Sequence, residues 1–372
     1  MKLIAQVKLQ PAPEQADMLL ETLKRVNAAA NYTSEYAWTN GVFRQYDLHH
    51  ALYYDLRQRF QLTAQIVVRL LAKVADGYKL DRKTKRTFKP HGSIAYDKRI
   101  LSWNLTAQTI SIWTVAGRQT IPFVAGDYHL RLLASMQGEA DLIYRNGNFY
   151  LHQTCEIDEP PTDDVSEFLG VDLGVANIAV DSDQTVYQGK TVKNVRFRHR
   201  RLRAKLQRKG TKSAKRRLRK LSGKERRFAT HTNHTISKRI VAAAKDTGRG
   251  IALEDLKGIR DRVRLRRSQR ATLHSWSFYQ LRQFIEYKSA LAGVSVIAVD
   301  PRNTSRTCPA CGCIDKRNRP DQATFSCVQC NFSGLADHIA AVNIGRRAVV
   351  SPPNVSDAPG PPDVAPGTKL PA

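Results

Sequence analysis

Three acidic residues close or open apolar segments of this sequence, and they constrain its fold more than any other feature. Asp172 ends the run Phe168–Val171, Glu254 ends the run Gly250–Leu253, and Asp337 opens a helix-like segment. Burying an unpaired carboxylate is costly, so each acid needs a cation, a cluster of hydrogen-bond donors or a place at the end of its element. The first two segments have the composition of buried strands, and together with the helical third they predict an α/β domain.

Carboxylates from two strands and a helix start are suited to phosphodiester hydrolysis with two divalent ions. Two hard cations ~4 Å apart must be neutralised and held by fixed oxygens, one to activate the attacking water and the other to stabilise the leaving oxygen. Taken singly, the acids have simpler explanations. Asp172 lies between two glycines and could be a turn residue, and Asp337 could cap its helix.

The net charge predicts a polyanionic partner. Lys and Arg total 60 against 33 Asp and Glu, which gives a formal charge of +27, and a surface this basic repels itself without counter-charge. Nucleic acid is the expected polyanion. A membrane is not expected as a partner, because no segment approaches the ~18 apolar residues of a spanning helix. The N-terminal residues lack the features of a secretory signal, so we expect the protein in the cytosol.

The most basic segment is 192–227, in which 18 of 36 residues are Lys or Arg and only Glu225 is acidic. A solvated helix face is the usual explanation of a charge run, but this density with so little acid favours contact with a nucleic-acid backbone. Arg260–Arg270 forms a second basic stretch. In the first segment, the predicted nucleic-acid contacts are Arg196, Arg198, Arg200, Arg201, Arg203, Lys205, Arg208, Lys209, Arg216, Arg217, Arg219 and Lys220.

Five of the six cysteines are confined to a short segment near the C-terminus. Cys308 and Cys311 form one Cys-x2-Cys pair, Cys327 and Cys330 form another, and fifteen residues separate the pairs. This spacing predicts a zinc ribbon that holds one Zn²⁺ tetrahedrally and leaves no position for water, so its role is structural. Buried free thiols are the alternative. Cys313 is a surplus thiol that could compete as a ligand.

The remaining sequence divides into segments of different periodicity. Residues 2–9 alternate like a strand, helix-like segments follow from Pro13 to about Tyr78, and short alternating runs between 93 and 158 predict a small β-barrel or sheet. Aromatic residues of the helical part, such as Trp38 and Tyr54, are expected mainly in the core, with base stacking as the alternative. Residues 160–164 have the composition of a linker, and the proline-rich residues 351–372 are expected to be a disordered tail.

Several motifs together resemble the TnpB family, which is related to the type V CRISPR effectors. Gly170–Asn177, Leu253–Leu256 and Asp337–Ile344 resemble the three RuvC motifs of that family, and the acid order Asp, Glu, Asp is that of RuvC-type nucleases. Trp276–Leu281, Glu286–Lys288 and Pro301–Gly312 are also similar to its signature. The resemblance covers about residues 168–347.

This resemblance implies a fold with a specific order of domains. An RNase H-like RuvC nuclease domain would span 165–350, with the zinc ribbon inserted at 304–335. An N-terminal β-barrel (wedge) would comprise 1–10 and 93–160, interrupted by a helical recognition domain at 11–92. The barrel and the helical domain would hold the guide RNA and read a short DNA motif, and Trp38, Tyr53, Tyr54 and the segment 79–89 are plausible contacts.

The resemblance also implies a function, namely a transposon-encoded, RNA-guided endonuclease that cleaves double-stranded DNA beside a short flanking motif. Asp172, Glu254 and Asp337 would bind two Mg²⁺ ions, and Asp255 could assist from beside them. The implied partners are a guide RNA from the transposon end and the target double-stranded DNA. A partner transposase is a further candidate. His231, Asn233 and His234 are expected to pack or to contact phosphate.

Two other functional classes remain open from the sequence. A nuclease-inactive, RNA-guided repressor would bind target DNA without cutting it, and a guide-free RuvC-type nuclease would cut particular DNA structures without bound RNA. The chain departs from the family pattern at one position, because the third motif usually reads Asp-x-Asn and Ile339 stands in the place of that Asn.

Overall fold

The structure is a computed structural model that describes residues 1–162, 164–174, 176–256 and 278–350. The chain divides into two units, Met1–Asp158 and Glu159–Ala372. The predicted tail, the basic stretch Arg260–Arg270 and Trp276 lie outside the described residues. In the described ranges, no helix is both long and apolar enough to cross a membrane.

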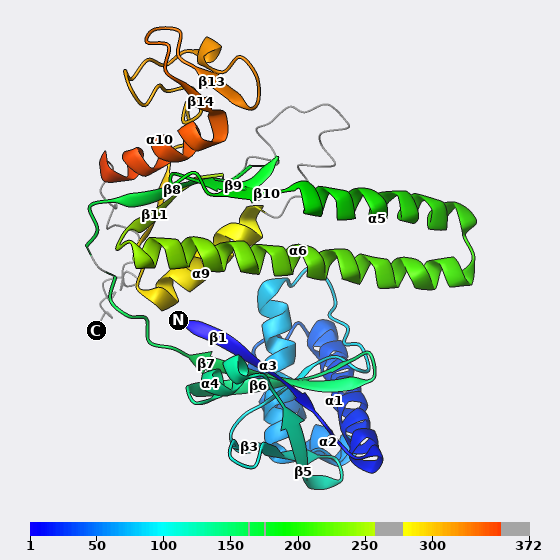
Figure 1. The fold of residues 1–372 in the computed structure, drawn as a ribbon. Coiled ribbons are helices and arrows are strands. Elements are labelled where there is room, and N and C mark those ends of the chain that lie inside the picture. The colour runs from blue at the N-terminus through cyan, green and yellow to red at the C-terminus, as the bar shows by residue number, and fades with distance from the viewer. Residues whose placement is uncertain (163, 175, 257–277, 351–372) are drawn as a thin grey trace, which may run out of the picture. The chain divides into compact units, whose positions relative to one another are not determined.

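The first unit is built on a seven-stranded antiparallel sheet that nearly closes into a barrel (Figure 1). The strand order is β2-β6-β7-β1-β5-β4-β3, so the first strand of the chain lies in the middle of the sheet. The Tyr96 hydroxyl, in edge strand β2, donates at 3.0 Å to the carbonyl oxygen of Trp113 in β4, which is the neighbour of the other edge strand, β3. The strands are β1 (Lys2–Leu9), β2 (Ile94–Tyr96), β3 (Leu101–Asn104), β4 (Thr109–Thr114), β5 (Gly117–Val124), β6 (Met136–Arg145) and β7 (Asn148–Glu156).

Three long helices lie between β1 and β2 in the chain, as the periodicity of the sequence predicted. They are α1 (Pro13–Asn40), α2 (Gln45–Phe60) and α3 (Ala64–Leu80), and the short α4 (Asp127–Leu133) follows β5. Proline at the first position of α1 fits the missing N–H there, and Gly41 ends the helix with a φ of 67°. The expectation of a core position is wrong for Trp38 and Tyr54, which are 39% and 79% exposed.

The second unit contains a five-stranded sheet in the order β10-β9-β8-β11-β12. β8 runs parallel to β11, which runs parallel to β12, whereas β9 is antiparallel to both of its neighbours. The elements are β8 (Phe168–Asp172), β9 (Asn177–Asp181), β10 (Val186–Gln188), α5 (Lys190–Lys209), α6 (Lys212–Asp246), β11 (Gly250–Glu254), α9 (Phe278–Ala292), β12 (Val296–Val299), the 3₁₀ helix η1 (Lys316–Asn318), β13 (Thr324–Ser326), β14 (Ser333–Leu335) and α10 (Ala336–Val350).

Helices cover both faces of this sheet, so its central strands are buried on both sides (Figure 1). On one face, Leu169 and Val171 of β8 pack in a core with Ile240 of α6 and Ile285 of α9. On the other face, Ala252 of β11 packs against α10. Successive side chains of a strand point to opposite faces. Asp172 and Glu254 are therefore directed toward the α10 face, in phase with Gly170 and Ala252.

Candidate active site

Asp172 and Glu254 occupy equivalent positions at the carboxyl ends of two adjacent parallel strands. Leu253 of β11 pairs with Val171 of β8, so the next residue of each strand is an acid at the same level of the sheet. The carboxyl edge of parallel strands is where α/β sheets form their binding sites. The sheet register alone therefore brings the first two predicted acids together.

Asp337 reaches the same edge because α10 lies unusually close to β8. A Cβ atom placed on Gly170 would lie 1.9 Å from the carbonyl oxygen of Ala341 and 2.5 Å from the amide nitrogen of Gly345, so only glycine permits this approach. Asp337 lies one turn before Ala341, in the first turn of α10. Its Oδ2 accepts a hydrogen bond from Nδ2 of Asn177 in β9 at 3.0 Å, so contacts beyond its own helix account for its position.

The three carboxylates interact electrostatically. Burial, followed by the negative charges of Glu254 and Asp337, raises the pKa of Asp172 to about 8, although the charge of Arg319 acts to lower it. Burial also raises the pKa of Glu254, against the opposing effects of its hydrogen bond from Thr304 and the charges of Arg347 and Arg319. A cluster of buried acids whose pKa values rise in this way lacks positive charge, and a bound cation would supply it.

A loop after β12 fixes the orientation of Glu254. Thr304 Oγ1 donates to Oε1 of Glu254 at 2.5 Å. The buried Asn343 of α10 holds this loop, because its Nδ2 donates to the carbonyl oxygens of Thr304 and Thr307, each at 2.8 Å. The motif Pro301–Gly312 therefore includes a segment that positions a carboxylate, in addition to the first pair of cysteines.

Arg319 was not identified from the sequence, although it lies beside the acids. It follows η1 in the ribbon, and its Nη2 atom is 3.6 Å from Oδ1 of Asp337. No motif surrounds it, because its position depends on how the ribbon folds onto α10. Asn177 and Thr304 do stand inside motifs that were recognised, but nothing in the sequence indicated which acid each would contact.

Asp255 has a different environment from Glu254. It forms an ion pair with Arg282 of α9 at 3.0 Å, and Arg282 also pairs with Glu286 at 2.7 Å. Its backbone N–H donates to the carbonyl oxygen of Val299 and continues the β11–β12 pairing. Asp255 therefore connects the end of β11 to α9.

The four predicted cysteines form a compact set that could hold one metal ion. Their sulfurs all lie within 4.8 Å of one another, and the Cys308–Cys330 and Cys311–Cys327 distances are both 3.6 Å. Four thiolates at ~2.3 Å from one ion would be ~3.8 Å apart, so these distances suit a tetrahedral site. Cys313 is not a member of this set.

The two cysteine turns have the same backbone hydrogen bonds. The backbone N–H of Cys308 donates to the carbonyl oxygen of Cys313 at 2.9 Å, and that of Cys327 donates to the carbonyl oxygen of Phe332 at 2.8 Å. Gly312 and Asn331 occupy matching positions with φ values of 75° and 57°. Such turns direct backbone N–H groups toward the sulfurs, which favours thiolate ligands.

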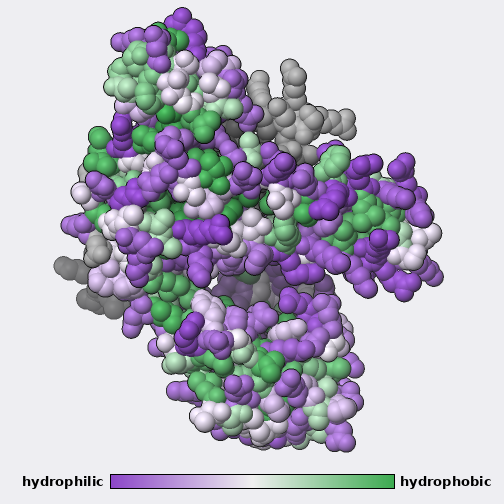
Figure 2. Space-filling model, in the orientation of Figure 1, coloured by the Kyte–Doolittle hydropathy of each residue, from purple (hydrophilic) through white to green (hydrophobic). Residues whose placement is uncertain are grey.

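The basic segment forms a helical hairpin of α5 and α6, which extends from the sheet of the second unit (Figure 1). Glu225 of α6 binds Arg203 of α5 at 2.9 Å, and its negative charge also acts on Arg196, so these two cations serve the hairpin itself in part. Figure 2 shows hydrophilic residues crowded along this hairpin. The other ten predicted contacts are Arg198, Arg200, Arg201, Lys205, Arg208, Lys209, Arg216, Arg217, Arg219 and Lys220, which are exposed or partly exposed.

Asn233 and His234, which follow the basic segment, pack against α9. Packing was one of the two roles predicted for them. The buried Asn233 donates from Nδ2 to Oε1 of Gln280 at 3.0 Å. The ring of His234 stacks on Phe284 with centroids 3.8 Å apart. His231 is exposed, so phosphate contact stays a prediction for this residue.

Known families match the chain over most of the second unit. Residues 152–257 match the family model described as a probable transposase, OrfB of IS605, and residues 278–344 match the model described as the Cas12f1-like TNB domain. A TnpB-like protein of Methanocaldococcus jannaschii is 35% identical over 35% of this chain and 46% of its own length. The resemblance to the TnpB family is confirmed.

Other relatives of this TnpB-like chain carry names of nucleases. The CRISPR-associated endodeoxyribonuclease Cas12f1 of Sulfoacidibacillus thermotolerans is 34% identical over 54% of the chain and 50% of its own length. A putative RNA-guided DNA endonuclease, InsQ of Escherichia coli, is 25% identical over 72% of the chain and 63% of its own length. The matches span half or less of the length of the Cas12f1 protein and of the TnpB-like protein.

A solved structure shares the fold of this TnpB-like chain. The Cas12f1 chain in a cryo-EM structure of a Cas12f1–sgRNA–target DNA complex superposes with a TM-score of 0.61 at 17% identity, covering 90% of this chain and 83% of that one. At this identity the likeness shows the fold alone. It confirms an α/β chain of the Cas12f type, with its TNB region and its nearly closed barrel.

Proposed function

We propose that this protein is an RNA-guided DNA endonuclease that cuts double-stranded DNA beside a short flanking motif, with a RuvC-like, RNase H-related active site formed by Asp172, Glu254 and Asp337. The convergence of these acids from β8, β11 and α10 carries the proposal. The sheet order supports the RuvC-like assignment, because it places the strands of the first and second motifs side by side. The names of the relatives are the reason for proposing a guide RNA and a DNA substrate.

The donor set fits two magnesium ions. Carboxylate oxygens are ligands that hard divalent cations prefer. Asp172 is close enough to Glu254 and Asp337 for both of their charges to act on it, and two ions ~4 Å apart need such a cluster of carboxylates. Divalent cations bound there would lower the pKa of the attacking water and neutralise the leaving oxygen.

The chain's own residues would hold these ligands in place and admit the substrate. Thr304 fixes one oxygen of Glu254, and Asn177 fixes Oδ2 of Asp337, whose Oδ1 lies 3.6 Å from Arg319 Nη2. Arg319 is placed to bind an anionic oxygen of a phosphodiester beside Asp337. The ten remaining predicted contacts on the α5–α6 hairpin would bind phosphates of RNA or DNA without reading the base sequence.

The ribbon would hold one Zn²⁺ through Cys308, Cys311, Cys327 and Cys330. Four thiolates fill a tetrahedral shell, so this ion would stabilise the ribbon and take no part in hydrolysis. The ribbon packs on α10 through Ile339 and Ala336, the residues on either side of Asp337 and His338. Its folding would therefore support the position of Asp337. We place the protein in the prokaryotic cytosol, and a partner transposase stays a prediction.

One experiment tests the proposal against both alternatives. The protein would be purified together with the transcript of the flanking transposon end, its bound RNA sequenced, and cleavage assayed on a plasmid library with randomised flanks in Mg²⁺. We expect bound RNA and guide-dependent cuts beside one motif. Binding without cutting would indicate a repressor, and cutting without RNA would indicate a guide-free nuclease.

The matched variants are Asp172→Ala and Asp183→Asn. Asp172→Ala should abolish cleavage and retain binding of RNA and target DNA, because removal of one ligand empties the metal site without changing the hairpin. Asp183 of the β9–β10 turn, which pairs with Arg249 just before β11, should be replaceable without loss of cleavage. Cleavage by Asp172→Ala at the wild-type rate would refute the assignment of the acids.

A further inference from the structure

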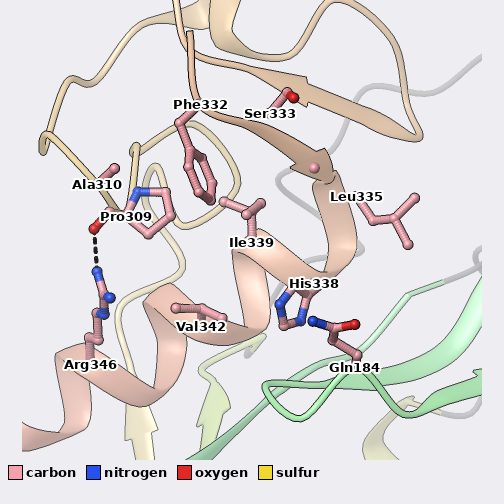
Figure 3. A pocket seen from close by; sticks show the side chains of 11 residues that line it. Gln184, Pro309, Ala310, Phe332, Ser333, Leu335, His338, Ile339, Val342 and Arg346 are labelled. Atoms are coloured by element: carbon pink, nitrogen blue, oxygen red, sulfur yellow. Dashed lines mark hydrogen bonds between the residues drawn. The ribbon is translucent and has the colours of Figure 1, made fainter. Parts of the chain in front are cut away.

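A cavity of about 490 Å³ lies between the ribbon and α10 (Figure 3). Its floor is the flank of α10 that carries Ile339 and Val342, and its upper wall is formed by Pro309 and Phe332 of the ribbon. Three of the α10 residues that line it, His338, Val342 and Arg346, are spaced about one helical turn apart and so belong to one face. This face adjoins the one that carries Asp337 toward the sheet.

The middle of the cavity is apolar and its two ends are polar. The ring of Phe332, which is 39% exposed, points toward Ile339, which is 2% exposed (Figure 3). At one end the Arg346 guanidinium donates a hydrogen bond to the carbonyl oxygen of Pro309. At the other end His338 lies beside the amide of Gln184 (Figure 3). A ligand with a flat aromatic ring and polar edges would match this distribution of apolar and polar groups.

The location of the cavity indicates which flat ring it takes. His338 directly follows Asp337, so the cavity opens one residue along α10 from the acid cluster. The protein carries a formal charge of +27, and Arg346 adds a cation at the cavity itself. Bases of single-stranded nucleic acid stack on aromatic side chains while cations bind the adjoining phosphates. A volume within the ~300–1,000 Å³ range of small-ligand pockets is sufficient for a base.

We propose that this cavity binds one unstacked base of the nucleic-acid strand that lies at the acid cluster, with Phe332 as its stacking surface and Arg346 at its phosphate. The proposal rests on the function proposed above, because that function brings a single strand to Asp337. A captured base would fix the register of the strand relative to the acids. It would thereby determine which phosphodiester is presented to them.

The test uses the full-length protein with its guide RNA, Ca²⁺ in place of Mg²⁺, and short single-stranded oligodeoxynucleotides that carry 2-aminopurine at one position each. Wild type would be compared with Phe332→Ala and Phe332→Leu. The leucine variant keeps an apolar side chain for the ribbon and removes only the aromatic ring. Val328→Ala is the matched control, because Val328 is an exposed apolar residue of the same ribbon, at 45%, that does not line the cavity.

We expect 2-aminopurine fluorescence to change at one or two adjacent positions in wild type and in Val328→Ala, and at none in the Phe332 variants. Both Phe332 variants should bind the oligonucleotide at least ~5-fold more weakly at fixed salt, the lower bound for loss of one stacked base. Fluorescence that does not depend on the position of 2-aminopurine would overturn the proposal. Wild-type affinity of Phe332→Leu for the oligonucleotide would also overturn it.

The two proposals fail separately in this design. If wild type captures a base, Phe332→Leu does not, and the protein cuts no DNA, the cavity remains a nucleic-acid site and the nuclease assignment is wrong. Guided cleavage by wild type, together with unchanged binding in both Phe332 variants, would keep the nuclease and remove the base site.

Discussion

Arg319 of the ribbon and Asp337 of α10 form an ion pair of 3.6 Å at the edge of the acid cluster. The guanidinium also lowers the pKa values of Asp172 and Glu254, so its charge acts on all three acids. A cation on this edge partly neutralises the acids in the ion-free protein. It also repels any divalent ion that binds them.

Replacing Arg319 with Gln should therefore tighten the binding of Ca²⁺ several-fold, because the repulsion is removed and the carboxylates stay. Arg319→Lys should leave the affinity close to that of wild type. Titration calorimetry with the zinc-loaded protein measures both values. Weaker Ca²⁺ binding in Arg319→Gln would mean that the arginine holds Asp337 in place and that its charge is secondary.

The raised pKa of Asp172 predicts how stability depends on pH. Its folded pKa of about 8 lies above the unfolded value of 3.8, so the folded state binds more protons between these values and stability falls as the pH rises through this window. Asp172→Asn removes the ionisation. We expect the stability difference between this variant and wild type to grow from pH 5 to pH 8 and to reach a few kcal/mol.

Urea unfolding in magnesium-free buffer measures this difference, without a chelator so that the ribbon keeps its metal. Added Mg²⁺ should restore most of the stability of wild type at pH 8, because the cations favour the ionised acids. A difference that stays constant with pH would show that Asp172 is already neutralised by its surroundings.

Gly170 is predicted to be intolerant of any side chain. The added Cβ of Gly170→Ala would meet the Ala341 carbonyl oxygen at 1.9 Å, and both partners are backbone, so α10 must move away from β8. We expect a loss of about 2–4 kcal/mol of stability and loss of cleavage, since Asp337 moves with the helix. Gly126→Ala is the control, because no atom lies within 4 Å of its Cβ position. An active Gly170→Ala variant would contradict this account of how Asp337 is placed.

The convergence of Asp172 and Glu254 was predictable from sequence because each signal is local. A carboxylate after four apolar residues marks a strand end, and parallel pairing of β8 and β11 then brings Asp172 and Glu254 together without further information. Arg319 was not predictable in this way, since its position depends on the folded ribbon. Charge density likewise identified the α5–α6 hairpin, but it could not show that Arg203 pairs with Glu225.

The spacing of the cysteines did not decide which four of them bind the metal. The structure brings Cys308, Cys311, Cys327 and Cys330 together. Cys327→Ser should lose the bound zinc and unfold the ribbon, whereas Cys313→Ser should retain one zinc per chain, because Cys313 lies outside the set of sulfurs within 4.8 Å. Elemental analysis of the purified variants measures the content. Zinc lost from Cys313→Ser and kept in Cys327→Ser would exchange the roles of these two residues.

Ile339, the departure from the family's third motif, belongs to the ribbon core and not to the acid cluster. It is 2% exposed and packs with Cys308, Phe325 and Cys327. Ile339→Asn would restore the family residue, yet it would bury an amide among apolar neighbours and should cost about 2–4 kcal/mol. Ile339→Val is the matched control, with an expected loss of about 1 kcal/mol. Thermal unfolding of the zinc-loaded protein measures both, and an Asn variant as stable as wild type would indicate that this core can satisfy a polar group.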